Sequence, residues 1–325
     1  MSSSDCNLVL PRPGADLAPS TAPIVGPSEA SFTSTFGNLL PPAQYLTTKN
    51  GKAAYYSIRP SSSQVPNTNS PERVLFIHGV QTPALGMLPL ARKLQASFPS
   101  AHFVLIDLWG HGLSDTPVVA HEAGLFHGLI DALLDHLQWP SAHLVGFSFG
   151  GSLTVGYAAS RAEGVQSYAL VAPAGLVEFA SLPEADQAHF RNDCDEDAAQ
   201  KWVVRWLEGG DLVVPADWKE RVARGEVVAE AVRDWQTHNH PGHTSSVVAI
   251  VRDGGVMDNH SNFKKAVATG VPSLVVLGEK DDLCTEEELR HLGFENVFVV
   301  PDAGHSVVRD RAGEVASFIG DFWRR

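Results

Sequence analysis

The 325-residue sequence contains few sulfur-bearing residues, with three cysteines and three methionines. Cys6, Cys194 and Cys284 lie far apart and show none of the paired spacings of disulfide frameworks or zinc sites. This usage is typical of proteins in a reducing compartment. The sequence also lacks a run of about eighteen apolar residues and a basic-then-apolar leader, so it predicts neither a membrane helix nor a secretory signal. We therefore expect a cytoplasmic protein that does not associate with membranes.

Basic residues are also scarce. Lys and Arg total 24 against 37 Asp and Glu, which gives a formal net charge of −13. With no basic stripe, nucleic acids and anionic membrane surfaces are poor partners. No phosphate-binding glycine signature is present, so we expect no nicotinamide or flavin cofactor.

Three histidines, His238, His240 and His243, have spacings that would permit a metal site. Pro241 and Gly242 stand between them and no cysteine is near. We therefore favour a solvated or pocket-facing loop over a metal centre, and we predict no metal in this protein.

The order of apolar segments predicts the fold. Residues 1–42 are rich in Pro, Ser, Ala and Gly and are predicted to form an irregular N-terminal arm. The Asn50-Gly51 step predicts a β-hairpin over residues 45–58. Amphipathic helices then alternate with buried strands, which we place near 74–77, 103–106, 144–147, 168–171, 273–277 and 297–300. This alternation predicts an α/β fold with a mostly parallel, doubly wound sheet covered on both faces.

The alternation stops between residues 176 and 256, where the pattern is helical only. We interpret this segment as a helical cap inserted into an α/β core formed by residues 43–175 and 257–325. Four of the seven tryptophans lie in the insertion. Trp202 and Trp206 are four residues apart, so they either hold an aromatic substrate or form one packed helix face. We take both, with His240, as candidate substrate-binding residues.

The segment Gly146-Phe147-Ser148-Phe149-Gly150 lies between a predicted strand and a predicted helix. A serine at the apex of such a turn has its hydroxyl exposed above the sheet, and the flanking glycines allow strand and helix to approach closely. The N–H of Phe149 opens the helix and points towards whatever Ser148 attacks. It is therefore a candidate oxyanion donor.

Polar residues follow two later strands. Asp281 comes after the strand at 273–277, and His305 comes after the strand at 297–300. A serine hydroxyl needs an imidazole to accept its proton, and a buried carboxylate then orients that imidazole. Ser148, Asp281 and His305 fit these roles as nucleophile, orienting acid and base. Asp282 stands next to Asp281 and is the alternative acid.

The sequence resembles the α/β-hydrolase fold superfamily over roughly residues 43–325. The resemblance rests on five motifs in order, namely His78-Gly79-Val80, residues 107–115, the Ser148 turn, Gly278-x-x-Asp281 and Gly304-His305. It implies an oxyanion hole from the N–H groups of Val80 and Phe149, and its spacing favours Asp281 over Asp282.

The same resemblance bears on the loop at residues 107–115. It implies that Asp107 and His111 brace loops around the pocket. Trp109 replaces the small residue or proline common at its position, and its ring either lines the pocket or packs under the loop. We include Trp109 among the candidate substrate-binding residues.

We therefore expect a cofactor-independent serine hydrolase acting on an ester or lactone of a small apolar or aromatic molecule. The resemblance also leaves open a carbon–carbon bond hydrolase of diketones, an acyltransferase, and a small-molecule receptor that retains the triad. Epoxide or haloalkane hydrolysis is disfavoured, because relatives with those activities have Asp where this chain has Ser148. The sequence does not determine an oligomeric state.

Overall fold

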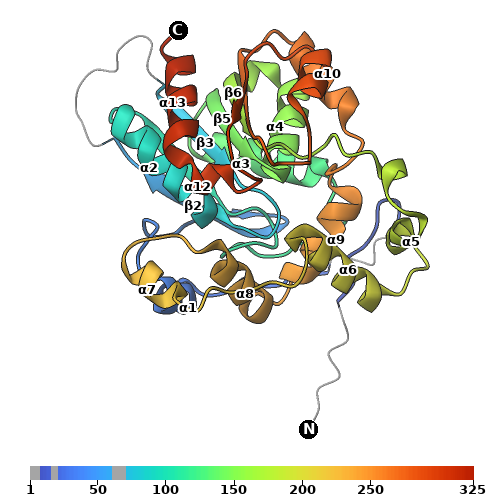
Figure 1. The fold of residues 1–325 in the computed structure, drawn as a ribbon. Helices are drawn as coiled ribbons and strands as arrows, with labels where there is room; N and C mark the ends of the chain where they lie inside the picture. The colour runs from blue at the N-terminus through green and yellow to red at the C-terminus, as the bar shows by residue number, and fades with distance from the viewer. Residues whose placement is uncertain (1–7, 16–20, 61–70) are drawn as a thin grey trace.

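The computed structural model describes residues 8–15, 21–60 and 71–325. An eight-stranded sheet with the order β1-β2-β4-β3-β5-β6-β7-β8 runs through the molecule (Figure 1). Its strands are β1 (Gln44–Thr48), β2 (Gly51–Ile58), β3 (Arg73–Ile77), β4 (His102–Ile106), β5 (Ala142–Phe147), β6 (Val165–Val171), β7 (Ser273–Gly278) and β8 (Val297–Val300). Strands β3 to β8 are parallel and β2 is antiparallel to both of its neighbours. The predicted α/β fold with a mostly parallel sheet is confirmed.

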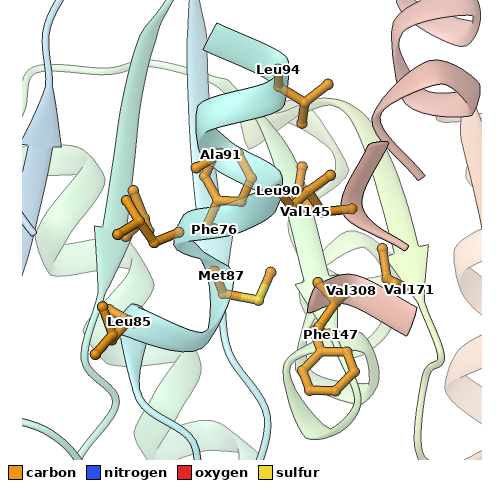
Figure 2. Packing of buried hydrophobic residues seen from close by; sticks show 14 of the residues in the cluster. Phe76, Leu85, Met87, Leu90, Ala91, Leu94, Val145, Phe147, Val171 and Val308 are labelled. Atoms are coloured by element: carbon orange, nitrogen blue, oxygen red, sulfur yellow. The ribbon is translucent and has the colours of Figure 1, made fainter. Parts of the chain in front are cut away.

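Helices cover both faces of the sheet. One face packs against α2 (Leu88–Ser97), α12 (Val307–Asp310) and α13 (Ala312–Trp323), and the other packs against α3 (Ala123–His136), α4 (Phe149–Ser160), α10 (His260–Ala268) and α11 (Glu286–His291). Successive residues of β3 alternate between the two apolar clusters, as the period of a strand requires. Figure 2 shows Met87, Leu90 and Leu94 of the α2 side packed towards Phe76 and Val145 of the sheet. The continuous apolar strands of the sequence are thus buried on both faces.

The predicted hairpin is present as β1 and β2, with a small shift of the turn. Thr48 pairs with Gly51, so Lys49 and Asn50 occupy the loop. Gly51 has a φ of 125°, a conformation that glycine adopts without steric cost. The hairpin extends the parallel sheet through the pairing of β2 with β4.

The prediction that residues 1–42 are irregular is wrong for part of this segment; residues 1–7 and 16–20 lie outside the described residues. Helix α1 (Glu29–Phe36) is capped at its N-terminus by Ser28, whose hydroxyl accepts a hydrogen bond from the Ser31 N–H. Phe32 and Phe36 are buried, and both rings lie against Trp235. The helix could not be predicted from the sequence, because its buried face consists of only these two residues, four positions apart.

The segment between β6 and β7 is helical, and residues 176–256 contain no strand. It comprises η3 (Phe179–Ser181), α5 (Glu184–Gln187), η4 (Ala188–Phe190), α6 (Glu196–Glu208), α7 (Trp218–Ala223), α8 (Ala229–Asn239) and α9 (His243–Asp253). Helices α6 and α9 enclose a small apolar cluster that includes Val203, Val247 and Val251. We propose that these helices form the cap domain; they lie together along one side of the sheet (Figure 1). None of the helices in the described ranges has the length and apolar character that a bilayer crossing requires.

Candidate active site

Ser148 occupies a sharp turn between β5 and α4. Its φ is 54° and its ψ is −120°, a conformation rarely adopted by residues other than glycine. The turn is possible because the neighbouring residue Gly150 has no side chain; a Cβ there would collide with the carbonyl oxygen of Ile77 in β3. The tight junction presents the Ser148 hydroxyl at the carboxyl end of the sheet, as the sequence pattern predicted.

The structure brings Ser148, His305 and Asp281 together. The His305 Nε2 lies 2.9 Å from the Ser148 Oγ, and the His305 Nδ1 lies 3.0 Å from the Asp281 Oδ2. The Asp281 side chain is 1% exposed and that of His305 is 40% exposed. Asp282 is exposed and makes no such contact with His305 in the described part of the chain. Of the two adjacent carboxylates, the geometry favours Asp281, while the catalytic roles stay predictions.

A loop passes directly over Ser148. We call residues 78–82, which follow β3, the oxyanion loop. A Cβ added at Gly79 would lie 2.8 Å from the Ser148 Cβ, so only glycine fits there. Val80 comes next and is half-buried in the wall of the cavity beside Ser148. Phe149 is the first residue of α4, so its N–H has no partner within the helix. Both predicted oxyanion donors therefore belong to backbone beside the serine.

A cavity of about 420 Å³ opens at Ser148 and His305. Its remaining wall is mostly apolar and comprises Val80, Ala174, Val177, Leu182, Trp206, Leu207, Glu208, Gly209, Val256, Asp281, Asp282 and Leu283. None of these lining residues is Lys or Arg. The size and lining suit a small, largely apolar molecule.

The four predicted substrate-binding residues are placed differently. Trp206 lines the cavity, whereas Trp202 stacks on Trp206 at a centroid distance of 5.7 Å and donates its Nε1–H to Asp186. Trp109 is fully buried in the apolar cluster under the loop. His240 is 3% exposed, with its Nε2 2.8 Å from the Ser114 carbonyl oxygen. Three of the four residues therefore lie outside the cavity wall, namely Trp109, Trp202 and His240. Helical spacing predicts which residues share a helix face, but it does not predict which part of the protein that face contacts.

The polar residues of the 107–115 loop brace it, as predicted. Asp107 accepts hydrogen bonds from the Tyr56 hydroxyl at 2.8 Å and from the N–H groups of Ala84 and Leu113 at 2.9 and 3.0 Å. Burial raises the pKa of Asp107 to about 6. The His111 Nε2 accepts a hydrogen bond from the Gln81 N–H at 3.1 Å. His111 therefore supports the oxyanion loop directly.

The prediction of a solvated or pocket-facing histidine loop is wrong for two of its three residues. His238 is exposed on α8, but His240 and His243 are buried against the 107–115 loop. The His243 Nδ1 lies 2.9 Å from the Gly110 carbonyl oxygen. Among the described residues, no group of three or more His, Cys, Asp or Glu is placed to hold a metal ion.

Two residues near the site are not predicted from the sequence, namely Glu208 in the cavity wall and Gln236 beneath the oxyanion loop. Glu208 is the last residue of α6, two positions after Trp206. A charged residue at a helix end is usually exposed to solvent, so its sequence position does not indicate a place in the cavity wall. Gln236 is fully buried on α8 in a segment of mixed polarity. The only sequence feature that could have indicated burial of Gln236 is its position next to the apolar Trp235.

Comparison with known proteins identifies the family. The sequence profile described as alpha/beta hydrolase family matches residues 74–318. The chain belongs to the α/β-hydrolase family. Helices α3, α4 and α10, all of β3 except Arg73, strands β4 to β8 and the three clustered side chains fall within the matched range.

Individual relatives are distant. The chain is 28% identical over 224 residues to the dihydrolipoyllysine-residue acetyltransferase component of the acetoin cleaving system of Pseudomonas putida, covering 68% of this chain and 56% of that protein. It thus spans little more than half of that relative. It is 24% identical over 270 residues to monoacylglycerol lipase ABHD6 of Mus musculus, covering 77% and 74%. The enol-lactonase of Burkholderia xenovorans LB400 superimposes with a TM-score of 0.63 at 21% identity, over 87% of this chain and all of that one.

Proposed function

We propose that this protein is a cofactor-independent serine hydrolase that cleaves an ester or lactone of a small apolar molecule. The observation that carries the proposal is the chain of contacts from Ser148 through His305 to the buried Asp281. A serine in this arrangement can be deprotonated as it attacks, and the carboxylate stabilises the imidazolium that forms.

The reaction proceeds in two halves. His305 takes the proton of Ser148 as the Oγ attacks the substrate carbonyl carbon, and the N–H groups of Val80 and Phe149 stabilise the oxyanion. The intermediate collapses, the carbon–oxygen bond breaks, and His305 gives the proton to the departing alkoxide. Water, deprotonated by His305, then attacks the acyl-enzyme. The acid is released and Ser148 regains its proton.

The substrate class follows from the cavity. Apolar side chains dominate its wall, and none of its lining residues is a Lys or Arg that would pair with a phosphate or carboxylate. A neutral acyl group that fits about 420 Å³ is therefore favoured. The printed names of two relatives, a monoacylglycerol lipase and an enol-lactonase, describe ester and lactone chemistry in those proteins.

Labelling with a fluorophosphonate probe tests the proposal, with hydrolysis of p-nitrophenyl acetate and butyrate followed in parallel. We expect the wild type to be labelled and to turn over steadily, and Ser148→Ala to fold normally without labelling or turnover. Normal turnover in Ser148→Ala would overturn the mechanism. Labelling without turnover would favour a receptor, and product that rises with added alcohol would favour an acyltransferase.

A further inference from the structure

The oxyanion loop contains a residue in an unfavourable conformation. Gln81, which follows Val80, has a φ of 66°, in the left-handed region that glycine favours. The Thr82 N–H donates back to the Val80 carbonyl oxygen at 2.9 Å, so the chain turns tightly here. A strained turn persists only where surrounding contacts hold it. The direction of the Val80 N–H therefore depends on what holds Gln81.

Gln236 of α8 holds the Gln81 backbone from the cap side. Its Nε2 donates to the Gln81 carbonyl oxygen at 2.5 Å, and its Oε1 accepts from the Gly112 N–H at 2.7 Å. The Gln236 side chain is fully buried. On the other side of the same residue, the Gln81 N–H donates to His111. Both polar groups of the Gln81 backbone are thus fixed, one by the core and one by the cap.

A second residue of the cap, Glu208, lines the cavity beside the oxyanion loop. Its side chain is nevertheless only 6% exposed, and its Oε1 lies 2.9 Å from the Arg233 Nε on α8. Burial raises the pKa of Glu208, while the Arg233 guanidinium acts in the opposite direction. Glu208 thus joins α6 to α8 at the edge of the cavity that Val80 also lines.

We propose that Gln236 is a positioning residue for the reaction. By fixing the Gln81 carbonyl it sets the direction of the Val80 N–H, so the oxyanion hole is complete only when α8 is seated on the core. The inference rests on the proposed function for its kinetic consequence, but the restraint on the loop is a property of the fold alone.

Two variants test the role of Gln236. Gln236→Leu removes both hydrogen bonds at similar volume. Gln236→Met also removes both hydrogen bonds with a side chain of nearly the same shape, and it serves if the first variant does not fold. Ser246→Ala is the matched control, because Ser246 is also a fully buried cap residue that donates to a core carbonyl, that of Trp109, outside the oxyanion loop.

The kinetic readout separates positioning from general damage. For p-nitrophenyl butyrate we expect kcat to fall roughly 10- to 100-fold in the Gln236 variants with KM within about threefold, since oxyanion donors act on the transition state. Butaneboronic acid, whose tetrahedral adduct on Ser148 uses the same donors, should bind more weakly by the same factor. Ser246→Ala should change neither by more than about threefold. Losses in the Gln236 variants no larger than in Ser246→Ala, or unchanged boronate affinity, would overturn the proposal.

A measurement without turnover keeps this inference distinct from the proposed function. Amide hydrogen exchange of residues 78–82 should accelerate in the Gln236 variants and stay unchanged in Ser246→Ala. Exchange that is unaltered in both would overturn the positioning role whatever the activity. Absent labelling and turnover in the wild type, together with the expected exchange pattern, would refute the hydrolase proposal and leave the restraint established.

Discussion

The sheet and the junction between cap and core are held by different kinds of contact. In the sheet and in helix α2, which covers it, side chains such as Phe76, Val145 and Leu90 are fully buried among other apolar groups. At the junction, polar side chains of α8 and α9 and the turn between them meet the backbone of the 107–115 loop. These are Gln236 at the Gly112 N–H, His240 at the Ser114 carbonyl, His243 at the Gly110 carbonyl and Ser246 at the Trp109 carbonyl.

This difference has a physical consequence. Apolar burial is non-directional and stabilises many similar arrangements, whereas a buried hydrogen bond is satisfied only in one geometry and costs free energy when it is broken. The core contacts therefore provide most of the stability. The junction contacts fix where the cap sits relative to Ser148. Changes in the two regions should accordingly be separable into effects on stability and effects on catalysis.

The largest expected effect concerns the directional contact within the site. Asp281→Asn removes the charge that orients His305 and stabilises its cation, and we expect kcat to fall roughly 10³- to 10⁴-fold with the fold intact. Asp282→Asn, a change of the same kind one residue away, should alter kcat less than about threefold. Ester hydrolysis with both purified variants measures this. The reverse ranking would mean that Asp282 is the orienting acid.

The core counterpart is Leu90→Ala. Leu90 is fully buried on α2 against the sheet (Figure 2), and its truncation leaves a cavity. We expect the free energy of unfolding to fall by about 2–5 kcal/mol, with kcat of the folded enzyme unchanged within about twofold. Denaturant unfolding and kinetics on the same preparation check both. A loss of kcat without a loss of stability would break the separation between core and junction.

The sheet and the clustering of the three side chains could be predicted from the sequence, because both depend on short-range sequence patterns. Most strands of the parallel part of the sheet are short apolar runs that are buried on both faces. Ser148 comes directly after such a run, and Asp281 and His305 come within a few residues of the ends of β7 and β8. Parallel strands bring their carboxyl ends to one edge, so chain order alone predicts that these residues meet. The structure then distinguished Asp281 from Asp282 by the direction of one side chain.

The junction was not predictable in the same way. His240 and His243 are polar residues beside Pro241 and Gly242, a composition typical of solvated loops, yet both are buried. Their burial depends on carbonyl groups more than 120 residues away in sequence, at Ser114 and Gly110. Helix α1 escaped prediction for a similar reason, since its burial depends on a tryptophan in α8. Pairings of this kind follow from tertiary packing rather than local pattern.

Acid should weaken the junction at a pH that leaves the apolar core unaffected. Burial lowers the pKa of His78 and His121 to about 4 and of His243 to about 3. Below about pH 6.5 these histidines become protonated in the unfolded chain but stay neutral in the folded protein. The free energy of unfolding therefore falls as the pH falls towards 4. The raised pKa of Asp107 acts in the opposite sense, since its folded form keeps a proton that the unfolded form releases.

These three histidines outweigh the one carboxyl, and burial lowers the pKa of His111 and His240 in the junction as well. We expect a net loss of at least about 2 kcal/mol between pH 6.5 and 5, measured by urea unfolding at each pH. His243→Phe, which carries no titratable group there, should make the dependence shallower. A dependence identical to that of the wild type would show that the buried junction does not control acid sensitivity.

The smallest expected effect lies where the N-terminal segment crosses the cap. Arg12 forms an ion pair with Asp253 at the end of α9, with a closest contact of 2.7 Å, and donates to the Phe190 carbonyl oxygen at 3.1 Å. The two side chains are 24% and 9% exposed, so the pair is partly screened by solvent.

We expect Arg12→Met to lower the free energy of unfolding by about 1 kcal/mol and to accelerate amide hydrogen exchange in α9 but not in β5. Arg224→Met is the control, because the pair of Arg224 with Glu226 is largely exposed and lies within a single loop. If exchange in α9 is equally unaffected by both substitutions, the segment around Arg12 lies on the cap without restraining it, and the cap is held by the polar junction alone.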